Sequence, residues 1–121
     1  MNDTKTVPQV LSTNTMIGDP VRNAAGEDLG QIEELMIDID RGRVNYAVLS
    51  FGGFLGIGDK LFAIPWDSLH LDTHNKCFYL NVDKEILEEA PGFDKNNWPN
   101  FADRKWGQTI YDYYGVNPYW N

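Results

Sequence analysis

The feature that most restricts the fold is a series of short apolar segments between residues 17 and 82, separated by glycines and other turn residues. Segments of this length and composition are typical of β-strands. No segment long enough for a crossover helix separates them, which favours a compact, partly closed barrel over a helix-covered parallel sheet. We therefore predict a mainly β fold, a small β-barrel of five to six strands with short C-terminal helices. The expected strands cover residues 16–22, 29–40, 44–51, 60–65 and 77–82, with residues 66–76 as a loop.

The expected strand over residues 29–40 has a break in its alternation. Its apolar residues are Ile32, Leu35, Ile37 and Ile39. The period of two residues therefore slips once after Ile32, and a β-bulge there would restore it. A short helical turn across residues 31–36 is the alternative that the pattern leaves open.

Residues 44–51 (VNYAVLSF) follow a tight hairpin loop at residues 40–43 and carry apolar side chains on both faces. A strand with this pattern is covered on both sides. We expect it to be a central strand. The next strand ends at Pro65, because proline cannot donate to the ladder of hydrogen bonds.

The C-terminal quarter differs from the rest in composition, since residues 91–121 hold 9 of the 16 aromatic residues. Before it, a short helix over residues 83–90 ends at Pro91 and Gly92. A second helix is expected over residues 101–114, with Asn100 as its N-cap and Gly115 as its end. Gly107 inside that helix costs about 1 kcal/mol relative to alanine. The face expected to pack consists of Ala102, Trp106, Ile110 and Tyr113.

The chain is thus predicted to have three parts. They are a flexible N-terminal tail at residues 1–10, a barrel domain at residues 11–90 and an aromatic-rich C-terminal extension at residues 91–121.

The charge of the chain argues against nucleic acid as a partner. The formal net charge is −8, and residues 1–90 hold 15 acidic against 7 basic residues. Such a surface repels phosphate backbones and anionic lipid heads. No apolar stretch is long enough for a membrane helix, and the N-terminus has no secretory signal pattern. With a single cysteine, Cys77, we expect a cytoplasmic protein with no direct membrane insertion.

The glycine cluster at residues 52–58 resembles a phosphate-binding loop only superficially. Its spacing is G-x-x-G-x-G, and a strand follows it rather than the helix that a dinucleotide or P-loop site requires. Asp59 next to Lys60 would also repel a phosphate. We interpret this segment as a wide hairpin loop.

Other chemical motifs are equally incomplete. His70 and His74 have the spacing of a helical zinc pair, but their flanks indicate a strand end and a turn. Asp38 and Asp40 resemble the start of a calcium loop that lacks its final Glu. The serines and Cys77 have no local catalytic motif. We therefore expect no enzyme activity, no cofactor and no metal.

Exposed apolar and aromatic residues are the candidates for an interaction surface. Three apolar residues lie on the glycine loop, and the aromatic residues of the extension are of the types enriched in interface hot spots. Packing on the chain's own barrel and contact with another subunit are equally compatible with the pattern, and an external partner is the third option. The candidates are Phe54, Leu55, Ile57, Trp98, Trp106, Tyr111, Tyr113, Tyr114 and Trp120.

The order of these segments resembles the PRC-barrel domain. The resemblance rests on Gly18-x-x-Val21, the turn from Gly26 to Gly30, a strand closing at Asp38, the Gly42-Arg43 turn and the strands containing residues 46–49 and 64–66. It covers about residues 11–90. Known members of the family include a barrel in the photosynthetic reaction centre H subunit and another at the C-terminal end of a ribosome maturation factor.

The resemblance implies a barrel that binds other macromolecules and has no catalytic site. The chain looks like a free-standing bacterial or archaeal member of the family. We accordingly expect a non-catalytic protein-interaction or adaptor module with a protein partner, first of all a second copy of itself in a homodimer. The alternative is a stress-related protein that binds a small molecule or an ion at the barrel mouth near Asp59.

Overall fold

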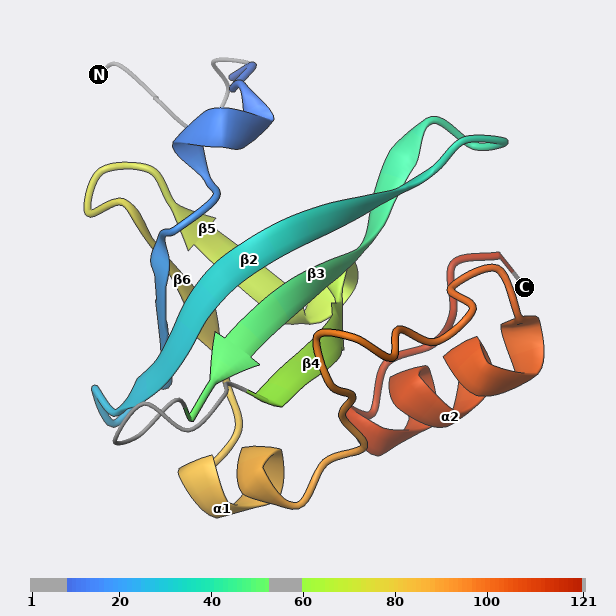
Figure 1. The fold of residues 1–121 in the computed structure, drawn as a ribbon. Helices are drawn as coiled ribbons and strands as arrows, with labels where there is room; N and C mark the ends of the chain where they lie inside the picture. The colour runs from blue at the N-terminus through green and yellow to red at the C-terminus, as the bar shows by residue number, and fades with distance from the viewer. Residues whose placement is uncertain (1–8, 53–59, 121) are drawn as a thin grey trace.

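The computed structural model describes residues 9–52 and 60–120 and shows a six-stranded, strongly curled sheet (Figure 1). The strand order is β4-β3-β2-β1-β6-β5; β1 and β6 are parallel, and the other neighbours are antiparallel. The sheet forms a half-barrel, so the predicted mainly β, partly closed barrel is confirmed. The strands are β1 (Pro20–Arg22), β2 (Asp28–Asp38), β3 (Arg43–Phe51), β4 (Lys60–Pro65), β5 (Leu69–Asp72) and β6 (Cys77–Leu80).

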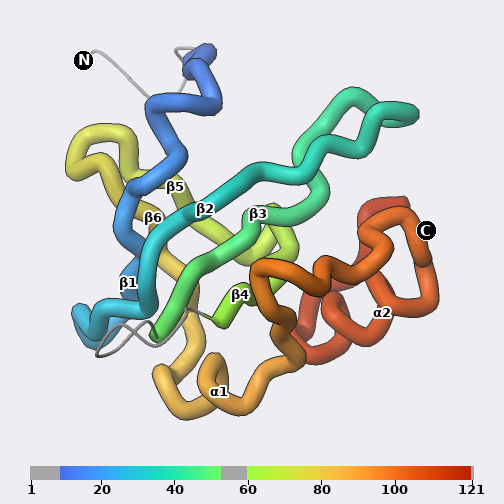
Figure 2. The backbone as a smooth tube through the Cα atoms, in the orientation of Figure 1, coloured from blue at the N-terminus to red at the C-terminus, as the bar shows by residue number. Residues whose placement is uncertain are grey.

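The long strand β2 curls because its pairing with β3 is irregular at two points. The register shifts between Ile32 and Glu34, and again between Met36 and Ile37. The first shift confirms the predicted β-bulge and rules out the helical turn. Extra residues of this kind bend a strand and increase its twist. The far end of the β2–β3 hairpin consequently extends beyond the other strands (Figure 2).

Strand β3 is buried on both faces, as its sequence predicts. Residues 46–50 are all buried. Ala47 and Leu49 belong to the main core inside the curled sheet, whereas Tyr46 belongs to a second cluster on the outer face. Because neighbouring side chains alternate across a strand, two separate layers must cover β3. The main core is formed by Met16, Val21, Leu29, Ile32, Ala47, Leu49, Phe62, Ile64, Phe78, Leu80, Leu87 and Ala90.

Gly30 allows β2 and β3 to come close together at the start of the hairpin. Its φ is +111°, and a Cβ atom there would lie 2.1 Å from the carbonyl oxygen of Ser50. Both facts require glycine, because other residues adopt this φ only with strain and the obstacle is backbone.

Two expectations for the strands are wrong. The first strand is restricted to Pro20–Arg22, because the 3-10 turn at Thr13–Thr15, capped by Ser12, continues into a turn at residues 16–18 that the amide of Asp19 closes by donating to the carbonyl oxygen of Met16. The expected loop at residues 66–76 contains a 3-10 turn at Trp66–Ser68 and the edge strand β5. The signal in the sequence was the alternation of Leu69 and Leu71 with polar neighbours, since both leucines pack against the main core.

Two helices follow the sheet, α1 (Lys84–Glu88) and α2 (Arg104–Tyr113). Helix α2 begins later than predicted, because Asp103 rather than Asn100 accepts hydrogen bonds from the first-turn amides. The Asn100 side chain instead accepts from the amide of Ala102 and forms the preceding turn. The helix ends before Gly115, whose φ of +71° confirms its predicted role.

The packed face of α2 also differs from the prediction. Its buried residues are Gly107, Ile110 and Tyr111, while Tyr113 is 37% exposed. Gly107 decides the orientation, because a Cβ atom there would lie 2.6 Å from the hydroxyl of Tyr46. The small residue lets the helix approach the sheet most closely at this point. Ala102, expected on this face, lies outside the helix.

Candidate interaction surface

The C-terminal extension packs on the outer face of its own sheet. Its first contact is with the edge strand β4, where the backbones of Leu61 and Phe93 exchange two hydrogen bonds of 2.9 and 2.8 Å. Helix α2 then lies against β4 (Figure 1). The second core joins Tyr46 and Ala63 of the sheet to Ile110 and Tyr111 of the helix. Of the arrangements that the sequence left open, packing on the chain's own sheet is the one that these contacts show.

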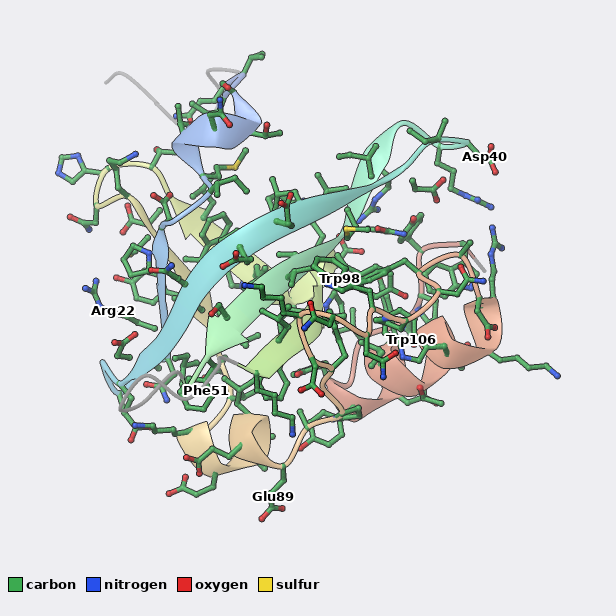
Figure 3. All side chains as sticks on the ribbon, in the orientation of Figure 1. Arg22, Asp40, Phe51, Glu89, Trp98 and Trp106 are labelled. Carbon is green, nitrogen blue, oxygen red and sulfur yellow. The ribbon has the colours of Figure 1, made fainter. Side chains whose placement is uncertain are left out.

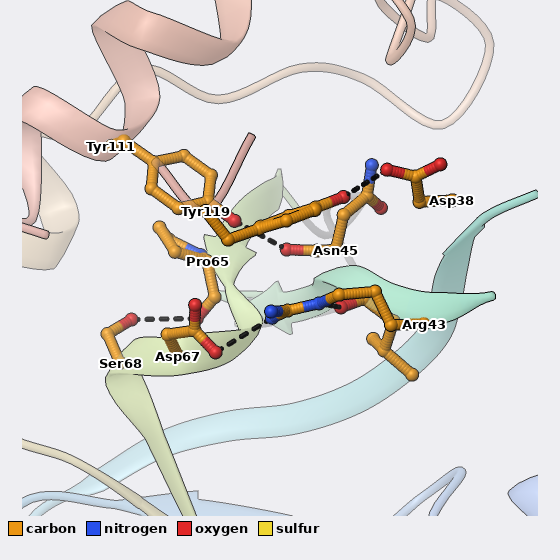
Figure 4. A network of polar contacts seen from close by, with 9 residues as sticks. Asp38, Arg43, Asn45, Pro65, Asp67, Ser68, Tyr111 and Tyr119 are labelled. Atoms are coloured by element: carbon orange, nitrogen blue, oxygen red, sulfur yellow. Dashed lines mark hydrogen bonds and ion pairs between the residues drawn. The ribbon is translucent and has the colours of Figure 1, made fainter. Parts of the chain in front are cut away.

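Two tyrosines tie the extension to the β2–β3 hairpin (Figure 4). The hydroxyl of Tyr111 donates to the carbonyl oxygen of Asn45 at 3.0 Å, and that of Tyr119 donates to the carboxylate of Asp38 at 2.5 Å. Beneath the Tyr119 ring lies the guanidinium of Arg43, 3.8 Å from the ring centroid. The same guanidinium donates to Asp67 at 2.7 Å. The end of the chain is thus held by hydrogen bonds and by a cation–π contact.

The pKa shifts of Tyr119, Asp38 and Tyr46 all favour the ordinary ionisation state of each group near neutral pH. Burial, followed by the bond to Asp38, raises the pKa of Tyr119 to about 12. The same bond holds the pKa of the Asp38 carboxyl below its ordinary value. Burial raises the pKa of Tyr46 far above the ordinary tyrosine value. These groups therefore have no tendency to exchange protons at pH 7, as a general acid or base would.

A groove of about 360 Å³ lies between the tip of the β2–β3 hairpin and the extension. We call it the hairpin groove. Ile37 and Ile39, which are 46% and 83% exposed, form its hairpin side. Figure 3 shows Asp40 at the tip of the hairpin. The remaining lining residues are Met36, Asp38, Asp40, Asn45, Tyr46, Phe101, Ala102, Asp103, Arg104, Tyr119 and Trp120.

The polar groups of the hairpin groove differ in how far they are already engaged. Asp38 accepts from Tyr119 and lies 3.7 Å from Arg41, and Asp103 caps α2. Asp40 is exposed and has no ion pair within residues 9–52 and 60–120. The side-chain oxygen of Asn45 is buried and has no hydrogen-bond partner among the same residues.

The structure places the predicted interaction residues in different environments. Phe54, Leu55 and Ile57 lie outside the described residues. Tyr111 is fully buried, and Trp106, Tyr114 and Trp120 are half-buried in or against the second core. Trp98 and Tyr113 are exposed, although the ring of Trp98 contacts Phe93 and Phe101 and the hydroxyl of Tyr113 donates to the carbonyl oxygen of Ile86.

Among the candidates that the structure describes, only Trp120 lines the hairpin groove. Ile37, Ile39, Phe101 and Tyr119 also line the groove but were not among the candidates predicted from the sequence. The first two carried a signal, because they continue the apolar alternation of β2 to the hairpin tip, where both side chains are exposed. Nothing in the sequence pairs Phe101 or Tyr119 with that hairpin.

Other kinds of site find little support in the part of the chain that the structure describes. No three histidine, cysteine, aspartate or glutamate side chains lie together as metal ligands there. None of the helices described is long and apolar enough to cross a membrane. A wider hollow of about 850 Å³ at the barrel mouth includes Gly30, Lys84 and Glu88, and it reaches Gly52, where the described residues stop.

Comparison with known proteins gives one clear result. The family model of the PRC-barrel domain matches residues 8–87, which is well over half of the chain. This span ends before the aromatic extension, so the match covers the curled sheet and all of α1 except Glu88. No curated protein matches the sequence.

Proposed function

Because the chain belongs to the PRC-barrel domain family, we propose that it is a non-catalytic protein-interaction module that binds its partner in the hairpin groove. The family by itself suggests a non-catalytic module. The hairpin groove adds a place where a partner would bind.

The observation that carries this proposal is the exposure of Ile37 and Ile39 beside an aromatic wall. Single exposed apolar residues are common on protein surfaces. These two line the same groove as Phe101 and Trp120, so apolar side chains of the hairpin and of the extension border one concave site. Such surfaces on a folded domain mark interaction sites.

A photo-crosslinking amino acid placed at Ile39 tests this proposal in cells. The control is the same amino acid at Ile86, which is 45% exposed on α1 and does not line the groove. We expect a defined protein adduct from position 39 that is absent from position 86 and is lost when Ile37→Asp is added. The proposal is wrong if position 39 yields nothing beyond what position 86 yields.

A second copy of the chain is one possible partner, and the hairpin tip favours it. The tip carries both signs of charge, Asp40 and Arg41, next to exposed apolar side chains. A surface of this kind can be self-complementary about a two-fold axis. In that case the adduct has twice the mass of the chain, and light scattering shows a dimer for the unmodified protein and a monomer for Ile39→Asp. A monomer in both cases excludes self-association and leaves a different protein as the partner.

A further inference from the structure

We propose that the hairpin groove binds the cationic side chain of a lysine or arginine in a basic segment of the partner protein. The inference rests on the proposed function and specifies the chemistry of the partner. The ring walls, the charge of the rim and one unsatisfied acceptor each support it.

Aromatic rings form much of the wall of the hairpin groove. Phe101 packs edge-on against Tyr46 at a centroid distance of 5.4 Å, and Tyr119 against Trp120 at 5.2 Å. The face of an aromatic ring attracts a cation within about 6 Å of its centroid. A lysine or arginine also has an apolar stem, which would cover Ile39 while its charged end reaches the rings.

The chain's own arginines show that these rings accept guanidinium groups. Arg43 lies 3.8 Å from the centroid of Tyr119, and Arg104 lies 5.5 Å from that of Trp120. Arg104 is exposed and lines the groove. Its cation–π contact with Trp120 is therefore weaker than a contact shielded from water would be. An incoming cation would compete with Arg104 for the same ring.

The charge of the rim favours a cation over an anion. Three aspartates line the groove against one arginine. Two of these carboxylates are partly engaged inside the chain, whereas Asp40 is exposed and without an ion pair within residues 9–52 and 60–120. The net charge of −8 attracts basic segments to the whole surface and repels acidic ones.

The side chain of Asn45 supplies an argument that does not depend on charge. Asn45 lines the groove, and its side-chain oxygen is buried and has no hydrogen-bond partner in the described parts of the chain. Buried acceptors are nearly always paired, so this atom calls for a donor. Ammonium and guanidinium groups donate, whereas carboxylates and phosphates in their charged forms only accept.

The size of the groove fits one long side chain. At about 360 Å³ it is near the lower end of the roughly 300–1,000 Å³ of small-ligand pockets. A partner would therefore bind as an extended segment that inserts a residue.

The test is an NMR titration of the full chain with short Gly-Ser peptides at about 50 mM salt, where electrostatic attraction is weakly screened. One peptide carries two arginines, and the others carry citrulline or glutamate at the same positions. Citrulline keeps the shape of arginine and removes its charge. We expect the Ile39 methyl and Trp120 indole signals to shift with the arginine peptide at a Kd at least tenfold lower than with the others.

Three variants sharpen the test. Asp40→Asn should raise the Kd of the arginine peptide about threefold or more, and Arg104→Gln should lower it by a similar factor. Glu33→Gln, which removes an exposed carboxylate of β2 that does not line the groove, should leave it unchanged.

Several outcomes overturn the inference. Equal binding of the arginine and glutamate peptides would do so, as would a Kd raised by Arg104→Gln, because that is the behaviour of an anion site. Tetramethylammonium binding as tightly as the peptide would instead assign the groove to a small cation. If no peptide binds but position 39 still crosslinks specifically, the basic partner is wrong and the interaction module stands.

Discussion

Tyr119 joins the end of the chain to the β2–β3 hairpin through two parts of one side chain. Its hydroxyl donates to Asp38, and its ring covers Arg43. The bond is the largest cause of the lowered pKa of the Asp38 carboxyl. Residues 81 positions apart in the sequence are thus linked at the edge of the hairpin groove.

This contact predicts a pH dependence. A carboxyl group whose pKa is lower in the folded than in the unfolded chain stabilises the fold fully above its unfolded pKa, about 3.9, and less as the pH falls through the folded pKa. Tyr119→Phe should therefore raise the pKa of Asp38. The free energy of unfolding of this variant should also fall less than that of the unmodified protein as the pH drops below about 4. NMR titration of the carboxyl carbon measures the shift.

The raised pKa of Tyr119 makes a separate prediction for high pH. Because the pKa of Tyr119 is raised to about 12, the contribution of Tyr119 to the free energy of unfolding is complete below the unfolded value, about 10, and is lost as the pH rises through 12.

An unchanged Asp38 pKa in Tyr119→Phe would show that the hydroxyl does not bind the carboxylate in solution. Asp72, whose lowered pKa arises from Asn75, is the internal control and should not respond.

Helix α2 can lie close to the sheet because Gly107 has no side chain. By helix propensity alone, Gly107→Ala should stabilise the helix by about 1 kcal/mol. The added Cβ would however lie 2.6 Å from the Tyr46 hydroxyl and 3.1 Å from Trp120. Overpacking of a buried contact costs about 1–3 kcal/mol, so we expect a net loss of about 1 kcal/mol.

A double-mutant cycle separates the two effects. Tyr46→Phe removes the nearest obstructing atom, so Gly107→Ala should be less harmful by about 1 kcal/mol in that background. Urea denaturation of the four proteins measures this coupling. If Gly107→Ala has the same effect in both backgrounds, the hydroxyl does not determine how closely the helix approaches the sheet.

For the secondary-structure elements, the sequence predicted the type of each element better than its first and last residues. The bulge after Ile32 and the buried strand β3 were predicted because both follow from the alternation of adjacent residues. The start of α2 was not, since Asn100 and Asp103 are both good capping residues. Their order along the chain does not show which of them accepts from a first-turn amide.

In the molecule as a whole, the C-terminal extension supplies half of the second hydrophobic core. Tyr46, Ile110 and Tyr111 are no more than 1% exposed, and burial of three such side chains contributes roughly 5 kcal/mol. This is comparable to the entire stability of many domains. The family match ends at residue 87, yet the outer face of β3 and β4 depends on residues beyond it.

We therefore expect a chain that ends at Pro91 to fold poorly. Its urea midpoint should fall sharply, and it should bind an apolar dye through the exposed face of β3 and β4. Adding residues 92–121 as a separate peptide should restore part of the stability. The same midpoint with and without the extension would mean that the second core does not contribute to folding.

The sequence by itself determined the type of fold and the positions of most strands. These depend on the alternation of neighbouring side chains and on glycines at sharp turns, which are local properties. It also showed that β3 must be covered on both faces, but not by what.

Only the tertiary structure decided that the extension covers that face and leaves the hairpin groove beside it. Aromatic residues such as Trp106 and Tyr111 can bury their surface equally well against their own sheet or against another protein, so composition cannot distinguish the two. The choice depends on contacts between distant residues, above all the fit of Gly107 to Tyr46 and the bond from Tyr119 to Asp38. Contacts of this kind exist only once the sheet has curled and the helix lies against it.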